Sequence, residues 1–128
     1  MARPARPARR AGSLKSSDAF TTFVLDQLDA LGDVVPRSMF GGVGLYRRGV
    51  FFGIIARDVL YLKTDEENRP DYERAGMPPF TPYPHRPVTM QYHAVPLDVL
   101  ETAPDLVEWA RKSLAAAGRS TGRRSRRP

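Results

Sequence analysis

The sequence predicts an α+β domain in which a mostly antiparallel sheet of about five to six strands carries helices. Two observations point to this class. Apolar residues near both ends of the body recur with a helical period, whereas those of residues 37–63 follow the pattern of strands. Signals for turns of only two or three residues separate the strand-like runs, and such turns join antiparallel neighbours. A length of 128 residues fits one domain of this kind and no second one.

The first expected element is a helix over residues 18–31. Ser17 supplies a capping hydroxyl, Asp18 an acid in the first turn, and Gly32 a typical stop. The apolar residues between them fall on one helical stripe and should face the core. They are Phe20, Phe23, Val24, Leu28 and Leu31.

Four β-type runs follow, at residues 39–40, 44–47, 50–56 and 59–63. The tight loops at "RRG" and "RD" predict that the last three form an antiparallel meander. The run "VFFGII" is apolar at almost every position, so we expect both faces of this strand to be covered. Helices would cover one face, and a second subunit is a candidate for the other.

A short helix is expected next, because Asn68 can cap it, Pro70 suits its first turn and Gly76 can end it. Tyr72 and Ala75 would point inward from this helix.

The proline-rich stretch 77–87 should be irregular or form a sheet edge. Residues 88–93 alternate as a half-buried strand does. The inward set would be Val88, Met90 and Tyr92, and the outward set Thr89, Gln91 and His93.

Two further helices should begin at Pro96 and Pro104, and Gly118 should end the last one. We interpret Trp109 and Tyr92 as packing residues rather than as a platform for stacking bases. The apolar face of the last helix comprises Leu106, Val107, Trp109, Ala110 and Leu114.

The net charge of +6 is concentrated at the two ends of the chain. Residues 1–15 and 118–128 are basic, contain no acid and are poor in large apolar side chains, which predicts two disordered tails around a folded body at 16–117. These tails would contact phosphates non-specifically, by counterion release, or serve only to keep the protein soluble. Their arginines are Arg3, Arg6, Arg9 and Arg10 at one end and Arg119, Arg123, Arg124, Arg126 and Arg127 at the other.

The composition excludes several classes of protein. Without cysteine there can be no disulfide scaffold, thiolate zinc site or cysteine nucleophile. The apolar runs are too short to cross a bilayer, and the N-terminal residues lack the apolar region of a secretory signal. We therefore expect a cytoplasmic protein without a membrane partner.

The glycine-rich stretch "RSMFGGVGLYRRG" would suit either a loop that cradles phosphate or a tight hairpin. A dinucleotide fingerprint or a P-loop needs a following helix, but a strand follows here, and the Lys and hydroxyl of a P-loop are missing. We therefore interpret Gly41, Gly42 and Gly44 as supplying positive φ, a bulge or room for close strand packing. Arg47 and Arg48, at the expected hairpin tip, form a solvated turn or contact a phosphate or an acidic partner.

Other residues give no sign of chemistry. The two histidines, His85 and His93, lack a pattern of metal ligands, and no serine lies in a G-x-S-x-G elbow. The acids at 65–67 and Asp71 fit a capped helix start better than a cation loop. We predict no catalytic residue, no metal ligand and no cofactor.

Several blocks, in order, resemble the N-terminal domain of the TfoX/Sxy family of bacterial competence regulators. These blocks are MFGG-x-GLY, LYLK-x-D, a helix of the form N-x3-aromatic that ends in Gly, the M-x-Y strand and the final WA helix, and they run from Met39 to about Ala117. The resemblance implies an α+β domain without accepted catalytic residues. We interpret the residues of the first block as fold-defining: Met39, Phe40, Gly41, Gly42, Gly44, Leu45 and Tyr46.

The resemblance also implies a class of function. Full-length members are similar to transcriptional co-regulators that act with a cyclic-AMP-responsive activator, and they usually carry a second, helical domain. This sequence does not show that domain, so we expect a single-domain member. Our first hypothesis is a non-enzymatic regulatory or interaction module that acts through an unidentified protein partner, with non-specific nucleic-acid contact by its tails.

Two alternatives stay open. A stand-alone protein-binding or chaperone-like homodimer, with no nucleic-acid role, would explain the very apolar central strand. A small enzyme that holds a phosphate ligand at the glycine-rich stretch has weaker support.

Overall fold

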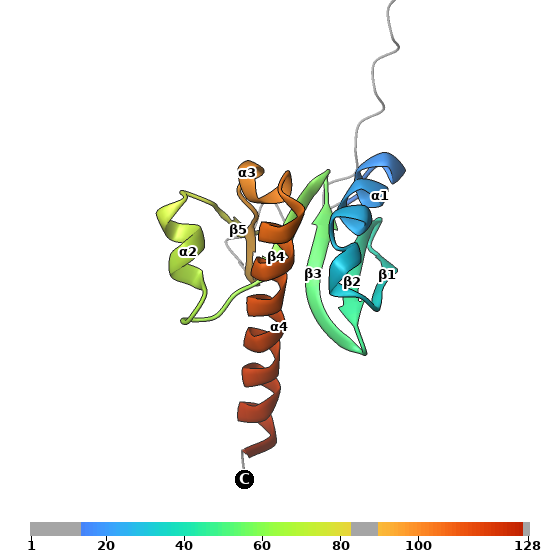
Figure 1. Ribbon diagram of the computed structural model, residues 1–128. Coiled ribbons are helices and arrows are strands. Elements are labelled where there is room, and N and C mark those ends of the chain that lie inside the picture. The colour runs from blue at the N-terminus through green and yellow to red at the C-terminus, as the bar shows by residue number, and fades with distance from the viewer. Residues whose placement is uncertain (1–13, 83–89, 127–128) are drawn as a thin grey trace, which may run out of the picture.

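The structure is a computed structural model that describes residues 14–82 and 90–126, with side chains described as far as residue 120. Its strands form one six-stranded antiparallel sheet in the order β1-β2-β3-β4-β6-β5, which confirms the α+β class (Figure 1). The elements are α1 (Asp18–Gln27), the 3₁₀ turn η1 (Asp29–Leu31), β1 (Val34–Met39), β2 (Gly42–Arg47), β3 (Val50–Ala56), β4 (Val59–Lys63), α2 (Arg69–Arg74), β5 (Pro79–Phe80), β6 (Met90–Ala94), α3 (Leu97–Leu100) and α4 (Ala103–Arg126).

The first helix begins where the sequence predicts. The Ser17 hydroxyl accepts a hydrogen bond from the backbone N–H of Phe20 at 3.1 Å, which is the expected cap. The α-helix ends earlier than expected, because the backbone leaves helical geometry at Leu28 and continues as η1. Gly32, with a φ of 79°, then turns the chain into the sheet.

The predicted meander is present, and its first strand is longer than expected. β1 begins at Val34, five residues before the expected start, and the expected strand residue Phe40 lies instead in the turn after Met39. β3 contains a bulge opposite the Leu45–Tyr46 step of β2. The extra residue, Phe52, turns into the main core.

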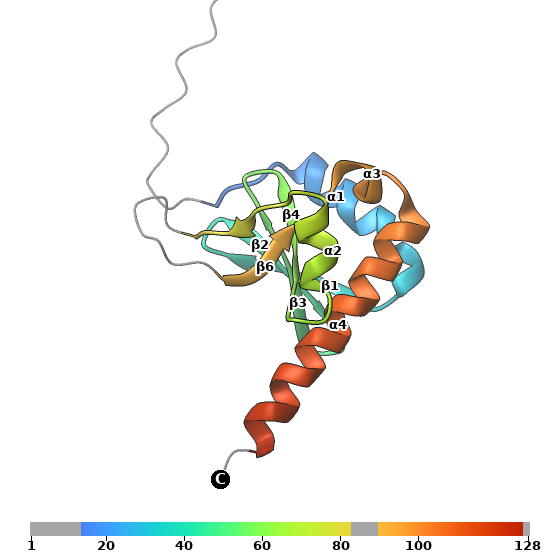
Figure 2. The same ribbon diagram turned by 90° about the vertical axis from the view of Figure 1, so that its left-hand side faces the viewer.

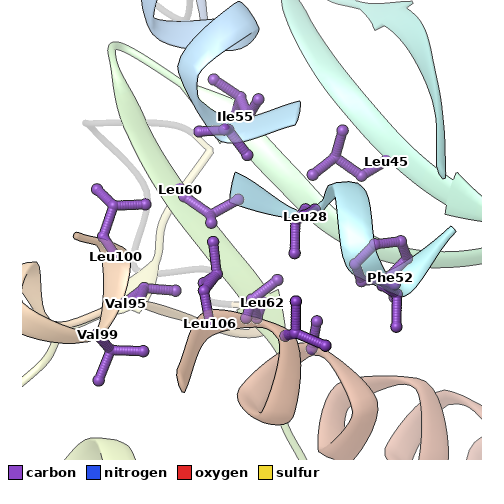
Figure 3. Close-up of a cluster of buried hydrophobic side chains, with 14 of the residues drawn as sticks. Leu28, Leu45, Phe52, Ile55, Leu60, Leu62, Val95, Val99, Leu100 and Leu106 are labelled. Atoms are coloured by element: carbon purple, nitrogen blue, oxygen red, sulfur yellow. The ribbon is translucent and has the colours of Figure 1, made fainter. Parts of the chain in front are cut away.

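All described helices pack against one face of the sheet, as the comparison of Figures 1 and 2 shows. Leu28 at the end of α1, Phe52 of β3 and Leu106 of α4 point into the same space and are fully buried (Figure 3). Burial of a large apolar side chain is worth about 1.5–3 kcal/mol, so this main core fixes the helical layer. Its other members are Val24, Leu31, Leu45, Ile55, Leu60, Leu62, Tyr72, Val95, Val99, Leu100, Val107 and Ala110.

The opposite face of the sheet carries a second, smaller core to which no described helix contributes. It consists of Leu14, Ile54, Ala56, Phe80 and Tyr92. β3 is therefore covered on both faces, as its apolar run predicts. Leu14 and Phe80 of β5 contribute to this cover from within the chain, and a second subunit at this face stays a prediction.

Four side-chain orientations differ from the expected ones. Phe23, expected to face the core from the first helix, is 38% exposed. His93 is buried, not exposed, because main-core elements cover its face of β6, and its ring lies 5.7 Å from that of Tyr72. Met90 is about one-third exposed at the start of β6, and Ala75 is exposed at the end of α2. Val88 and Thr89 lie outside the described residues.

Both expected tail boundaries need correction. α4 does not end at Gly118 but continues to Arg126, so residues 118–126 are helical rather than part of a disordered tail. Gly118 has a helical φ and open space around it, so nothing there forces a stop. At the other end Leu14, expected in the tail, is buried. Residues 1–13 lie outside the described part of the chain.

Candidate interaction surface

The turn of the MFGG block joins β1 to β2. Phe40 and Gly41 have φ values of 50° and 87°, so both occupy the left-handed region, which Gly tolerates and Phe adopts at a cost. The Phe40 side chain is 81% exposed. Met39 packs against the second core and Leu45 is buried in the main core. The block thus combines core residues with one exposed ring.

Gly42 allows two backbone segments to approach each other. A Cβ at this position would lie 2.6 Å from the carbonyl oxygen of Ile55 and 2.9 Å from that of Leu14. The N–H of Leu14 donates to the carbonyl of Phe40 at 3.2 Å, and its carbonyl accepts from the N–H of Arg57 at 3.3 Å. The glycine therefore leaves room for the segment before α1 to lie across the sheet.

The two arginines of the β2–β3 turn have different environments. Arg47 donates from Nε to the carbonyl of Gly32 at 3.0 Å and from Nη2 to that of Leu31 at 3.1 Å. It satisfies carbonyls at the end of η1, so its guanidinium is already engaged. Arg48 forms an exposed ion pair of 2.9 Å with Asp33. An exposed pair is weak and leaves Arg48 accessible to another anion.

The remaining predicted arginines divide between described and undescribed parts of the chain. Arg123, Arg124 and Arg126 are residues of α4. In both views the C-terminal turns of α4 project beyond the sheet (Figures 1 and 2). The other predicted contact residues, namely Arg3, Arg6, Arg9, Arg10 and Arg127, lie outside the described residues.

A row of aromatic and basic side chains crosses the face of the sheet that carries no helix. We call it the aromatic row: Arg37, Tyr46, Phe51, Tyr92 and Lys63. Arg37 lies 5.6 Å from the Tyr46 ring centre, and the Tyr46 and Phe51 rings stack at 5.0 Å. The Phe51 and Tyr92 rings are 5.4 Å apart, and the Lys63 ammonium lies 5.3 Å from the Tyr92 ring. Cations at such distances are attracted to the ring faces.

Strand register explains this row. Tyr46 is directly opposite Phe51, and Lys63 is directly opposite Tyr92, so each pair shares a face. Tyr46 and Phe51 are half-buried, whereas Tyr92 is 4% exposed, as its interpretation as a packing residue predicts. Burial raises the pKa of Tyr92 above its ordinary value of 10.0, so this hydroxyl is neutral at physiological pH.

A cavity of about 540 Å³ opens at the Lys63 end of the aromatic row. Four segments meet there, namely the β2–β3 turn, the end of β4, the start of β6 and α4. Lys63 carries the one formal charge among the described lining residues. They are Gly49, Val50, Phe51, Lys63, Met90, Tyr92, Ala117 and Ser120.

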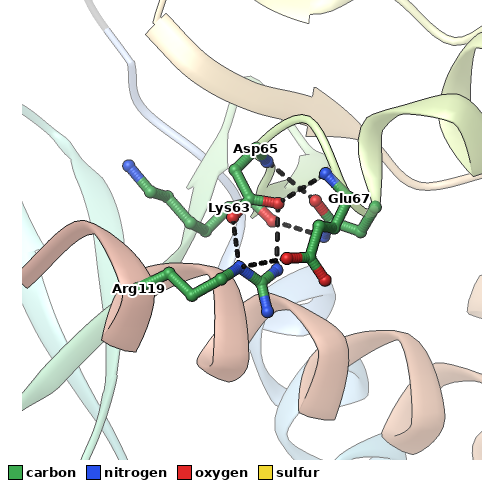
Figure 4. Close-up of polar contacts among 5 residues, drawn as sticks. Lys63, Asp65, Glu67 and Arg119 are labelled. Carbon is green, nitrogen blue, oxygen red and sulfur yellow. Dashed lines mark hydrogen bonds and ion pairs between the residues drawn. The ribbon is translucent and has the colours of Figure 1, made fainter. Parts of the chain in front are cut away.

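An ion pair fixes α4 beside this cavity (Figure 4). Arg119 donates from Nε to Asp65 Oδ2 at 2.7 Å and from Nη2 to Asp65 Oδ1 at 3.0 Å, and its Nε lies 3.4 Å from Glu67 Oε2. Asp65 Oδ1 also accepts from the N–H of Glu67, and Asn68 links the N–H of Asp65 to the carbonyl of Lys63. The Arg119 hydrogen bonds are the main reason that the pKa of Asp65 is lowered to about 2.

The acids of the loop at residues 64–68, between β4 and α2, were expected to belong to a capped helix start, with Asn68 as the cap. Asn68 occupies the cap position, but its side chain bonds to the loop and not to α2. Asp65 and Glu67 of this loop therefore hold α4 through Arg119. The sequence could not reveal this role, because the helix was expected to end before Arg119.

A second polar contact, between Thr64 and His93, is buried beside the main core. The Thr64 hydroxyl and His93 Nδ1 are 2.9 Å apart, both buried. Burial lowers the pKa of His93 below 6.5, so the ring is neutral near pH 7. The hydroxyls of Tyr72 and Ser113 are both buried, and neither makes a hydrogen bond of good geometry among the described residues, although Ser113 is close enough to act on the pKa of Tyr72. Burial raises the pKa of Tyr72.

Two classes of feature are absent from the part of the chain that the structure describes. No three side chains of His, Asp or Glu gather there as metal ligands, and the predicted candidate His85 is not among the described residues. None of the described helices is both long and apolar enough to cross a bilayer.

A single sheet with helices on one face and an aromatic row on the other defines a two-layer α+β domain. Residues 26–117 match the TfoX N-terminal domain, and this match covers most of the chain. The chain therefore belongs to the TfoX N-terminal domain family, which confirms the resemblance found in the sequence. A search of curated proteins found none that matches it.

Proposed function

We propose that this chain is a non-enzymatic regulatory module of the TfoX type, which acts through protein partners and also contacts nucleic acid non-specifically through its arginine-rich ends. Membership of the family supports the regulatory class. Fold alone does not define function, so the contacts are argued from surface residues.

The observation that carries the nucleic-acid contact is the projection of α4 beyond the sheet, with Arg123, Arg124 and Arg126 on it (Figure 1). A helix holds these residues at fixed spacing, 1.5 Å of rise per residue, instead of on a free tail. Lys and Arg that neutralise phosphates release counterions, which makes the affinity fall steeply with salt.

The experiment uses the full chain, because a shortened chain of residues 16–117 would remove the buried Leu14 and the ion-paired Arg119. Two variants each replace four arginines by glutamine, so their charge changes match. One alters the C-terminal end (Arg123, Arg124, Arg126 and Arg127), and the other alters the N-terminal end (Arg3, Arg6, Arg9 and Arg10).

Binding to a labelled duplex is measured by anisotropy across a salt series. We expect the C-terminal variant to bind more weakly than the N-terminal one, and its salt slope to fall by about 0.9 for each phosphate that it no longer neutralises. Unchanged binding by both variants would contradict the nucleic-acid half of the proposal.

The protein-partner half of the proposal is supported by Phe40, a large ring that is 81% exposed in the turn of the MFGG block. Exposed aromatic side chains are frequent anchors of interfaces. Leu97 of α3 is a matched control, since it is 65% exposed and lies on the helical side of the molecule. We expect Phe40→Asn, but not Leu97→Asn, to abolish co-purification of a partner. Equal retention by both variants would exclude Phe40 as an anchor.

The alternative of a chaperone-like dimer was based on β3, whose second face now has a cover within the chain. No described contact favours that alternative. Light scattering on the purified chain tests it directly, because a stable dimer at micromolar concentration would restore it.

A further inference from the structure

The cavity beside α4 has no role in the arginine contacts proposed above. Ala117 and Ser120 of the same helix nevertheless form part of its wall. Its volume of about 540 Å³ lies within the range of small-molecule sites, about 300–1,000 Å³. Phe51 and Tyr92 supply aromatic surface, Val50 and Met90 supply aliphatic surface, and Ala117 is too small to fill the space. These walls suit a flat, apolar group.

The polar groups at the cavity suit an anion that is attached to such a flat group. Lys63 supplies an ammonium and Ser120 a hydroxyl. Asp65 and Glu67, in the loop between β4 and α2, both lie against Arg119 of α4, so this guanidinium offsets one of their two negative charges. A bound anion would therefore meet Lys63 within the cavity and, further along the helix, the arginines at the end of α4, against the one negative charge that Arg119 leaves uncompensated.

The cavity lies beside the arginine-rich end of α4, so a ligand with several anionic groups could contact both. Ser120 lies in the cavity wall, and Arg123 and Arg124 follow three and four residues later, about 5–6 Å further along α4 and within about 60° of Ser120 around the helix. A strand with one base in the cavity would carry its next phosphates past the arginines of α4. A repeating chain of flat groups and phosphates is the chemistry of a nucleic acid.

Aromatic walls of this kind favour an unpaired strand over a duplex. In a duplex the bases stack on one another and their faces are covered, whereas a single strand presents unstacked bases to aromatic side chains. The half-buried rings of Phe51 and Tyr46 continue the apolar surface away from the cavity toward Arg37.

We propose that this cavity accepts a base of single-stranded nucleic acid, while Lys63 and the arginines of α4 contact its phosphates. This inference rests on the proposed function and deepens it, because it changes the expected ligand from a duplex held by charge alone to a single strand.

The test compares two variants that place the same carboxylate on one turn of α4. Ser120→Glu puts it in the cavity wall, and Gly118→Glu puts it about 200° around the helix, where a Cβ would meet nothing within 4 Å. The probes are a fluorescein-labelled oligothymidine of 15 nucleotides and a duplex of the same length. Lys63→Met is a second variant that keeps the aliphatic stem but removes the charge.

We expect the wild-type chain to bind oligothymidine more tightly than duplex. Ser120→Glu should weaken oligothymidine binding at least about 5-fold more than Gly118→Glu does, with equal effects of both on the duplex. Lys63→Met should lower the salt slope for oligothymidine by about one. Thermal unfolding of each variant shows whether it is folded.

Equal weakening of oligothymidine binding by the two glutamate variants would refute the proposal that the cavity binds a base. Equal affinity of the wild-type chain for duplex and single strand would refute it as well. Neither result would contradict the proposed phosphate contacts of the arginines. Binding of a polyglutamate peptide in place of oligothymidine would overturn it in favour of an acidic protein segment. No nucleic-acid binding at all would overturn both this inference and the nucleic-acid half of the proposed function.

Discussion

Replacement of Arg119 by alanine should loosen the end of α4 and raise the pKa of Asp65. In the folded chain this pKa is about 2, against an ordinary value of 3.8. One pKa unit corresponds to about 1.36 kcal/mol, so the whole shift is worth at most ~2.5 kcal/mol. Arg119 is one-third exposed, and the N–H of Glu67 also stabilises the carboxylate, so its own share is smaller. We expect Arg119→Ala to lower the free energy of unfolding by ~1–2 kcal/mol at pH 7.

The lowered pKa of Asp65 determines how the stability difference between wild type and Arg119→Ala changes with pH. Because folding lowers the pKa of Asp65, the stabilisation is complete above about pH 4 and is lost as pH falls through about 2. The gap in stability between wild type and Arg119→Ala should therefore narrow below pH 4. In the variant, the Asp65 carboxyl should titrate near its ordinary value.

Urea unfolding between pH 3 and 7 measures the gap, and a carbon-detected NMR titration follows the Asp65 carboxyl itself. Arg111→Ala is the matched control, since Arg111 is an exposed arginine of the same helix. If both variants were equally stable and the pKa of Asp65 stayed near 2, the ion pair would not hold α4 and the reasoning would fail.

Three further predictions concern the core. Gly42→Ala should cost ~3 kcal/mol in urea unfolding, because its Cβ meets two carbonyl oxygens, whereas Gly49→Ala, with open space and a φ of 81°, should cost only ~1 kcal/mol; equal costs would contradict the close approach. Tyr72→Phe should change the free energy of unfolding by less than ~1 kcal/mol, since the removed hydroxyl makes no hydrogen bond of good geometry and has only a weak contact with Ser113. A clear fall in stability would show that the two hydroxyls are hydrogen-bonded. Burial lowers the pKa of His93, so its contribution is complete above about pH 6.5 and is lost as pH falls through the lower folded value; His93→Gln should flatten the stability profile between pH 7 and 5, and an unchanged profile would place that dependence elsewhere.

Local features of the sequence predicted the fold well where a short-range cause decides the structure. The Ser17 cap, the turns of the meander and the Pro-led starts of α3 and α4 all depend on neighbouring residues. The expected end at Gly118 failed because a helical glycine without a positive φ does not force a stop, and the ion pair of Arg119 favours continuation. The prediction that His93 is exposed was wrong, because β6 lies between β4 and β5 and the helical layer covers the face that carries His93. The alternation of residues along a strand does not reveal which face is covered.

The candidate surface was harder to predict than the fold. Arg37, Tyr46, Phe51, Tyr92 and Lys63 come from different strands, and they meet only through the register of the sheet. A single sequence does not reveal this register for β6, which pairs with β4 across a long connection. The cavity adds a wall from α4, whose length was underestimated, so its composition could not be read in advance.

The position of β6 has a consequence for the order of assembly. Strands β1 to β4 are neighbours in both sequence and space, so this half of the sheet can form through local contacts. β6 must close a loop of about thirty residues to reach β4, and non-local pairings of this kind form slowly. The cavity takes its walls from both halves, so it exists only after β6 and α4 have docked. Local opening of the last turns of α4 would remove Ala117 and Ser120 from the cavity wall, while Leu106 and Ala110 keep the main core packed. Occupancy of the cavity would therefore report whether the end of α4 is docked.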